Sequence, residues 1–157
     1  MNEGNLSALE SFGQSVSQVL EQMAFMFSDP ADPEMMLEDP GDCYLVQMSY
    51  LGPCSGKVAV AVQADLGREV GSNMLGADLD QVTDTMVGDA LKEMLNMSCG
   101  QFLTSYYGNE PVFDLTVPEI SRLDTAAWKE LAAGPDNCLY EVDEYQYVVS
   151  VEPGDKG

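Results

Sequence analysis

The chain contains no histidine, and this absence excludes more chemistry than any other feature of its composition. Imidazole bases, Ser-His and Cys-His catalytic pairs and histidine-ligated metals all need that side chain. Basic residues are also scarce, since 6 lysines and arginines stand against 27 acidic residues and give a net charge of −21. Such a chain repels phosphate backbones and anionic lipids. We therefore expect no nucleic acid and no membrane surface as partners, although the charge by itself also fits a simple role in solubility.

Cysteine pairs and long apolar runs are missing as well. The 4 cysteines lie far apart, without a CxxC pair, so the sequence gives no support for zinc binding or thioredoxin chemistry. We expect reduced thiols, most of them buried. No apolar run approaches the length of a membrane span, and residues 1–10 lack the basic and apolar regions of a signal peptide. These absences predict a cytoplasmic protein.

The chain does contain enough apolar sequence for one core. Its 157 residues, 45% of them hydrophobic, predict a single domain over residues 1–157. Apolar residues at helical spacing predict a first helix from Leu6 to Phe27, with Ser7 as a cap. The segment Ser28–Asp42 has 3 prolines and 6 acids without periodicity, which indicates a solvated loop. A calcium loop is a weak alternative, because the EF-hand glycine and glutamate spacing is missing.

The middle of the chain begins with a predicted hairpin. Two β-rich runs, Cys43–Leu51 and Lys57–Ala64, flank a turn rich in glycine and proline. Asp65 then has the position of a cap for a short helix, and Gly76 suits the end of that helix.

A longer central helix follows. Asp78 and Gln81 have the spacing of a capping box, and the helical pattern continues to about Tyr106. Alternating apolar residues in "PVFDLTVP" then predict a half-buried strand, which Pro118 ends.

The last part of the chain predicts a short helix and two strands. Asp124 is placed to cap a helix that runs to Gly134, and the strands turn near Asp143 and Glu144. The hairpins argue against a doubly wound parallel sheet. We predict an α/β (α+β) domain with a mostly antiparallel sheet covered by two long helices.

Three polar residues share one side of the central helix. Asp89, Glu93 and Asn96 fall within about 60° of one another, opposite the apolar side of the helix. A solvated helix face explains the same pattern. With 13 Glu and 6 Asn in the chain, about half a match to Glu, two residues and Asn is expected by chance. The spacing alone therefore leaves both a solvated face and a site open. The residues predicted to face the core are Val87, Leu91, Met94, Leu95, Ser98 and Phe102.

The sequence around this face resembles the CheX-type members of the CheC/CheX/FliY family of chemotaxis phosphatases. The segments "SGKVAVAV", "NMLG", "DALKEMLNMSCGQF" and "DLTVP" carry the resemblance, which is best over Ser55–Pro118. The family signature is Asp or Ser, three residues, Glu, two residues, Asn, and then about 22 residues before a Pro. The matching positions are Asp89, Glu93, Asn96 and Pro118, with 21 residues between the last two.

This resemblance implies an enzyme that hydrolyses the aspartyl phosphate of a CheY-like response regulator receiver domain. Asn96 would position the attacking water, and Glu93 would contact the receiver's active-site lysine. Asp89 and Met97 would contact the partner, with core packing an equally open role for Met97. The resemblance further implies a homodimer and no cofactor or metal site of its own, the Mg²⁺ belonging to the receiver. The alternative is a non-catalytic adaptor that binds receivers or the flagellar switch, which has no need of a water-positioning amide at Asn96.

The first helix departs from the pattern of a second site. Some relatives, CheC among them, carry one there, and Ser17 and Glu21 fit its spacing. Ala24 stands where the asparagine would be, and its methyl group cannot orient a water molecule. We therefore expect one active site per chain, with Ser17 and Glu21 as ordinary surface residues.

Overall fold

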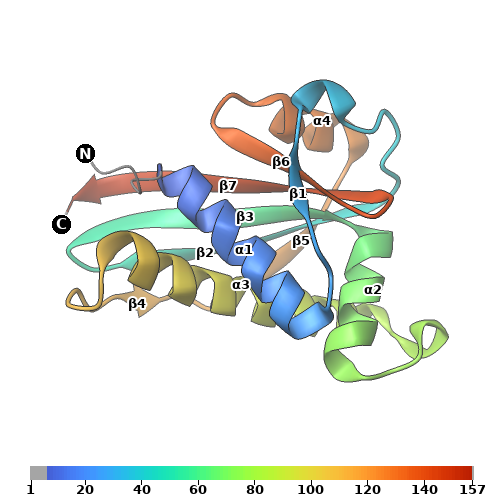
Figure 1. Ribbon diagram of the computed structural model, residues 1–157, viewed down its shortest axis with the longest axis horizontal. Helices are drawn as coiled ribbons and strands as arrows, with labels where there is room; N and C mark the ends of the chain where they lie inside the picture. The colour runs from blue at the N-terminus through green and yellow to red at the C-terminus, as the bar shows by residue number, and fades with distance from the viewer. Residues whose placement is uncertain (1–6, 157) are drawn as a thin grey trace.

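The computed structural model describes residues 7–156, which form a seven-stranded sheet (Figure 1). The strand order is β1-β6-β7-β3-β2, and β4 and β5 both pair with the outer edge of β2. Every pairing in this part of the chain is antiparallel, so the predicted α+β class and antiparallel sheet are confirmed. The strands are β1 (Asp29–Ala31), β2 (Cys43–Leu51), β3 (Cys54–Gln63), β4 (Asp114–Leu115), β5 (Glu119–Leu123), β6 (Asn137–Val142) and β7 (Tyr145–Lys156).

Within the described residues, three helices pack on one face of the sheet and a fourth covers part of the other (Figure 1). They are α1 (Ala8–Ala24), α2 (Ala64–Leu75), α3 (Asp84–Tyr107) and, on the opposite face, α4 (Thr125–Ala133). Alternation along β3 builds both cores, because Val60 packs on the three-helix side while Ala61 packs against Trp128 of α4. Burying a side chain such as Val60 contributes about 1.5–3 kcal/mol. None of these helices has the length and apolar character needed to cross a membrane.

Helix α1 has the predicted cap at Ser7, begins at Ala8 and ends earlier than predicted. Ser7 Oγ accepts a hydrogen bond from the Glu10 amide at 3.1 Å, and the Glu10 carboxylate accepts one from the Ser7 amide at 3.0 Å, which completes a capping box. The helix ends at Ala24 because Phe25 adopts a left-handed φ of 56°. Phe27, the predicted last residue of this helix, therefore lies beyond it and is 70% exposed. The predicted first helical residue, Leu6, lies outside the described residues.

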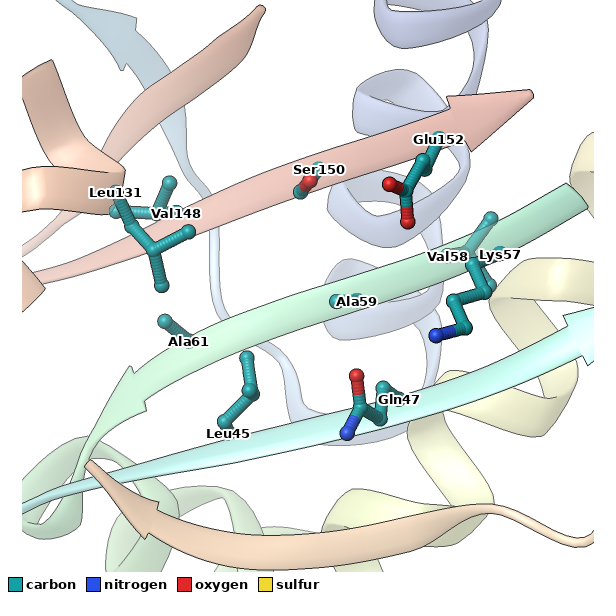
Figure 2. A pocket seen from close by; sticks show the side chains of 10 residues that line it. All are labelled: Leu45, Gln47, Lys57, Val58, Ala59, Ala61, Leu131, Val148, Ser150 and Glu152. Carbon is teal, nitrogen blue, oxygen red and sulfur yellow. The ribbon is translucent and has the colours of Figure 1, made fainter. Parts of the chain in front are cut away.

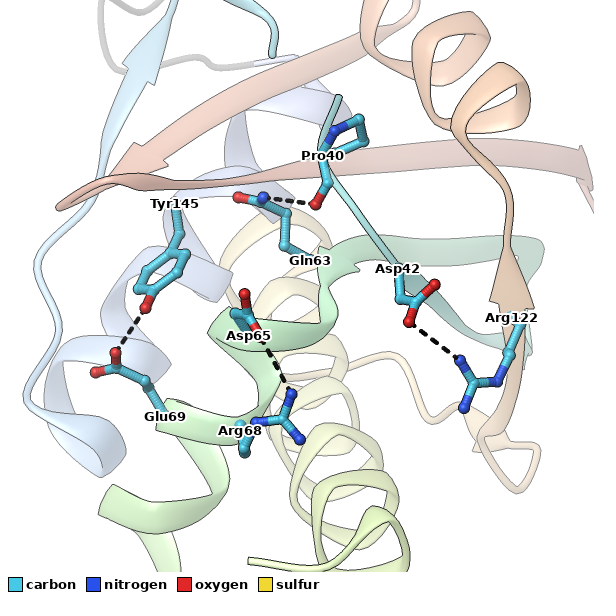
Figure 3. A network of polar contacts seen from close by, with 8 residues as sticks. All are labelled: Pro40, Asp42, Gln63, Asp65, Arg68, Glu69, Arg122 and Tyr145. Carbon is cyan, nitrogen blue, oxygen red and sulfur yellow. Dashed lines mark hydrogen bonds and ion pairs between the residues drawn. The ribbon is translucent and has the colours of Figure 1, made fainter. Parts of the chain in front are cut away.

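The predicted caps of the next two helices are wrong. Helix α2 starts at Ala64, so Asp65 lies inside its first turn and pairs with Arg68 at 3.1 Å (Figure 3). Before α3, Asp78 precedes only a short 3₁₀ turn, η2 (Leu79–Gln81), and its side chain makes no capping hydrogen bond. Thr83 caps α3 instead, accepting from the Met86 amide at 3.2 Å.

Other predicted boundaries agree with the structure. Gly76 ends α2 with a left-handed φ of 68°, and α3 continues to Tyr107, one residue beyond the predicted end. Asp124 caps α4 by accepting from the Ala127 amide at 2.8 Å. The turn between β6 and β7 falls at Asp143, which has a φ of 54°.

The segment Ser28–Asp42 is not the free loop that was predicted. It contains β1, which pairs with β6, and a 3₁₀ turn, η1 (Pro33–Met35). Two buried glutamines hold its backbone. Gln63 donates to the Pro40 carbonyl at 2.9 Å (Figure 3), and Gln146 donates to the Met35 carbonyl at 2.8 Å. The acids of this segment face solvent while its backbone is tied to the sheet.

The half-buried strand predicted to end at Pro118 is wrong, because β4 covers only Asp114–Leu115 and Leu115 and Val117 are 39% and 81% exposed. β2 advances three residues from Tyr50 to Gln47 while the paired chain advances four, from Leu115 to Glu119. The extra residue makes a β-bulge between β4 and β5, where a proline costs no ladder hydrogen bond. The chain therefore leaves strand structure over residues 116–118 and pairs with β2 again as β5.

Candidate functional site

The outward face of α3 is the first part of the site. All six residues predicted to face the core are buried, whereas Asp89, Glu93 and Asn96 are exposed. The polar residue among the six, Ser98, is satisfied within the helix because its hydroxyl donates to the Met94 carbonyl at 2.7 Å. Among the described residues, none forms a hydrogen bond or ion pair with the side chains of Asp89, Glu93 or Asn96. Packing and folding therefore leave these three side chains unused.

The second part of the site is the bulged edge of the sheet. A groove of about 360 Å³ separates it from α3. Pro118 and Asn96 both line this groove. Val117, lifted outward at the bulge, is 81% exposed. The groove is lined by Asp89, Lys92, Glu93 and Asn96 from α3, and by Leu115, Thr116, Val117 and Pro118 from the sheet edge.

Sequence reasoning missed four of these lining residues. Lys92 lies on the side of α3 that faces the sheet edge, and its helical angle of about 40° from Asn96 is the signal that could have identified it. The other three, Leu115, Thr116 and Val117, come directly before Pro118 in the sequence. Because Pro118 belongs to the family signature, its neighbours could have been considered as site residues. The bulge that turns them toward the groove depends on pairing with β2, which no local pattern contains.

Met97 lies outside the groove lining. It is partly buried and packs against the main core, which matches the core-packing role left open for it. Its contact with a partner stays a prediction.

The corresponding residues of α1 do not form a comparable surface. Ser17 is half-buried and accepts a hydrogen bond from Ser28 Oγ at 3.2 Å, and Ser28 also bonds to the Tyr147 hydroxyl at 2.7 Å. Glu21 is exposed, but Ala24 has 0% exposure. The expectation that Ser17 is an ordinary surface residue is therefore wrong, because its hydroxyl bonds to Ser28 inside the protein. The position where an asparagine would be needed is buried.

A second hollow, of about 140 Å³, lies on the sheet face that α4 leaves uncovered (Figure 2). Its lining is mainly apolar and includes Leu45, Ala61 and Val148, with Lys57 and Glu152 at one end. Lys57 and Glu152 are cross-strand neighbours on β3 and β7. No base and nucleophile are hydrogen-bonded to each other among the residues that line this hollow.

Cysteine and metal chemistry find no additional site in residues 7–156. All four cysteines are free, with Cys43 and Cys99 buried and Cys54 and Cys138 partly buried. Burial raises the pKa of Cys43 and Cys99 to about 12, so both stay protonated near neutral pH. No cluster of three or more Asp, Glu or Cys side chains suited to a metal ion occurs in this range.

A known protein family matches the part of the sequence that forms this groove. The sequence matches the family model described as "Chemotaxis phosphatase CheX" over residues 44–135, more than half of the chain. This range includes Asp89, Glu93, Asn96 and Pro118. No curated protein matches the sequence.

Several solved structures are similar to this chain. A chemotaxis protein CheX from Desulfovibrio desulfuricans is 18% identical with a TM-score of 0.69, covering 94% of this chain and 99% of that one. A CheX-CheY-BeF3-Mg²⁺ complex from Borrelia burgdorferi matches with 20% identity and a TM-score of 0.64, over 96% of this chain and 100% of that one. FliY from Thermotoga maritima is 14% identical with a TM-score of 0.54, over 89% and 83% of the two chains. At these identities, the likeness to solved structures establishes a shared fold.

Proposed function

This chain belongs to the CheX family of chemotaxis phosphatases, and we propose that it hydrolyses the aspartyl phosphate of a CheY-like receiver domain. One observation supports this most directly. The Asn96 amide points outward into the groove beside Glu93, without a hydrogen bond to any described residue. An exposed amide that serves neither packing nor folding is free to act on a partner.

In the proposed reaction, Asn96 enters the receiver's active site and holds a water in line with the phosphorus. The amide donates to and accepts from the water and does not titrate. The water oxygen forms a bond to phosphorus while the bond from phosphorus to the aspartyl oxygen breaks. The bonding electrons return to the aspartate carboxylate, and the products are that carboxylate and inorganic phosphate. Positioning of this kind lowers the barrier by about 3 kcal/mol, on the order of a hundredfold in rate.

Glu93 and Asp89 have docking roles in this proposal. Glu93 pairs with the lysine that lies beside the receiver's phosphorylated aspartate, which fixes the angle at which Asn96 enters. Asp89, one helical turn before Glu93, contacts the edge of the same basic surface. Leu115 and Val117 supply an exposed apolar border on the opposite side of the groove. Together they give a polar row and an apolar row, as a protein-binding surface needs.

The partner and its metal follow from the same proposal. The Borrelia burgdorferi complex contains CheX, CheY, BeF3 and Mg²⁺, which supports a CheY-like partner for this chain too. We expect the Mg²⁺ to be held by the receiver, with no cofactor bound by this chain. We also expect this protein to act in the cytoplasm, as its receiver does, and to form a homodimer. Light scattering of the purified protein gives its molar mass and so tests the dimer.

The decay of phosphate from a purified, phosphorylated CheY receiver tests the function. We expect the wild type to accelerate the decay and Asn96→Ala to return it to the rate of the receiver alone. Glu93→Ala should weaken docking and raise KM. Thermal melting of each variant should match the wild type, because both side chains are exposed.

Two results would change the assignment. A wild type that binds the receiver without accelerating decay favours the alternative, an adaptor that binds receivers or the flagellar switch through the same surface. If Asn96→Ala is as fast as the wild type, the phosphatase activity stands and the role of Asn96 is wrong.

A further inference from the structure

Lys92 is the basic side chain of the groove, and the rest of the described protein leaves it unpaired. Basic residues are few in this chain, 6 in all. Arg68 pairs with Asp65 at 3.1 Å, and Arg122 lies 3.9 Å from Asp42. Lys92 forms no ion pair within residues 7–156, although Asp89 precedes it by one turn and Glu93 follows it directly.

The position of Lys92 relative to Asn96 is the second observation. At about 100° per residue, Asn96 lies about 60° from Glu93 on the helix, and Lys92 lies about 40° further in the same direction. Asn96 therefore stands between a carboxylate and an ammonium group. Lys92 is on the side that faces the bulged edge, where it lines the groove with Leu115 and Val117.

The charge of the surroundings gives this arrangement a consequence. The protein carries −21, and Asp89 and Glu93 add two carboxylates to the groove itself. A phosphoryl group that approaches Asn96 meets this negative field, which opposes binding. Lys92 has a compact charge with three donors on a flexible stem, and it can follow a phosphoryl oxygen without a fixed geometry.

We propose that Lys92 binds a phosphoryl oxygen of the phosphorylated receiver, so that this protein distinguishes the phosphorylated from the unphosphorylated form. The inference rests on the proposed function, since it places the phosphoryl group next to Asn96. Glu93 then contacts a cation of the receiver and Lys92 contacts its anion, on either side of the water-positioning amide. Lys92 is a binding residue in this arrangement, and the attack of water does not change its protonation.

Binding to two forms of one receiver tests the proposal. The probes are a CheY receiver with Mg²⁺, either alone or loaded with beryllofluoride as a stable stand-in for the phosphoryl group. We expect Lys92→Met to weaken binding of the loaded receiver about tenfold and binding of the bare receiver less than about twofold. Lys92→Arg, which keeps the charge, should stay within about threefold of wild type for both forms.

Lys129→Met is the matched control. Lys129 lies on α4, on the opposite face of the sheet, and its replacement changes the net charge by the same amount. It should leave both affinities unchanged. In steady-state dephosphorylation, Lys92→Met should raise KM about tenfold while kcat stays within about twofold, and Lys129→Met should match wild type.

Two results would contradict the contact between Lys92 and the phosphoryl group, and a third would keep that contact but contradict the phosphatase activity. Equal binding by wild type and Lys92→Met overturns it, and so does an equal loss for loaded and bare receivers, because Lys92 would then contact something other than the phosphoryl group. If wild type fails to accelerate decay but Lys92→Met still loses its preference for the loaded receiver, the phosphatase function falls and the phosphoryl contact stands.

Discussion

Replacing Asn96 with aspartate, which has the same size and shape, tests whether the hydrogen-bonding ability of its amide is what matters. Asn96→Asp keeps the size of the group but replaces the donor NH₂ with an ionised oxygen, which cannot donate to a water lone pair and repels the phosphoryl group. We expect the decay of a phosphorylated receiver to fall to the rate of the receiver alone, a loss on the order of a hundredfold. The melting temperature should stay unchanged, because the side chain is exposed. Retention of more than about a tenth of the activity would contradict water positioning by the amide.

Ala24 provides a test of the single-site prediction. Its side chain has 0% exposure, so Ala24→Asn buries an amide that the surrounding core cannot satisfy. We expect a loss of about 1–3 kcal/mol in the free energy of unfolding, measured in urea. Ala133→Asn is the control, because Ala133 is also the last residue of a helix but is exposed. A double variant that carries both Asn96→Ala and Ala24→Asn should be as inactive as Asn96→Ala alone. Recovery of dephosphorylation in the double variant would show that α1 can form a second site.

At the scale of elements, the bulged edge between β4 and β5 can be tested apart from α3. Val117 lines the groove and is 81% exposed, while Val112 is 80% exposed and lies outside the groove. We expect Val117→Asp to raise the KM for phosphorylated receiver at least about fivefold, because it places a charge where apolar contact is proposed. Val112→Asp adds the same charge and should have little effect. If both variants raise KM equally, net charge and not the groove edge is responsible.

The burial and the ends of a helix were predictable where a single local sequence pattern determines them. Apolar spacing in α3 translates directly into burial, so the core face and the outward face of Asp89, Glu93 and Asn96 were both found from the sequence. The start of α3 was not predicted correctly, because Asp78 and Thr83 are both residues that favour the N-cap position. Thr83 is the cap because the η2 turn separates Asp78 from the helix. Choosing between competing local signals needs the surrounding packing.

The sheet edges were less predictable because their partners are distant in sequence. Gln146 holds the carbonyl of Met35 from 111 residues away, and Gln63 holds that of Pro40 from 23 residues away. Neither glutamine stands out in its own strand. The continuation of the chain past Pro118 likewise depends on β2, so half of the groove lay outside what composition and periodicity can indicate.

For the whole molecule, the acidic charge should limit stability at low salt. The ion pairs among described residues, Arg68 with Asp65 and Arg122 with Asp42, involve largely exposed side chains and leave most of the −21 charge unbalanced. Screening reduces the resulting repulsion. We expect the melting temperature to rise by about 5 °C between 20 mM and 500 mM NaCl. An equal rise in KCl, whose ions screen equally, would support this cause, and a flat or falling melting temperature would contradict it.

Docking should respond to salt in the opposite direction. The acidic row of α3 is proposed to meet basic receiver surface, and screening weakens that attraction. The KM for phosphorylated receiver should therefore rise over the same salt range in which the protein becomes more stable. A KM that falls or stays constant would indicate docking dominated by the apolar edge at Leu115 and Val117.

Alkaline pH should destabilise the fold through two stacked tyrosines. The rings of Tyr140 and Tyr147 lie 5.1 Å apart, and burial raises the pKa of Tyr140 to about 12 and that of Tyr147 in the same direction. Since the unfolded pKa of tyrosine is about 10, the contribution of these two tyrosines to stability is complete below pH about 10 and is lost as the pH rises toward and through the folded pKa. We expect the two tyrosines to lower the free energy of unfolding above pH about 10, by up to about 1.4 kcal/mol per pH unit for each group. This loss adds to the one from Cys43 and Cys99, which starts near the ordinary thiol pKa of 9.0 because burial raises both to about 12. Tyr147→Phe should reduce this slope, because it removes one of the two buried phenols. An equal slope in wild type and Tyr147→Phe would mean that the Tyr147 phenol does not contribute to the alkaline transition.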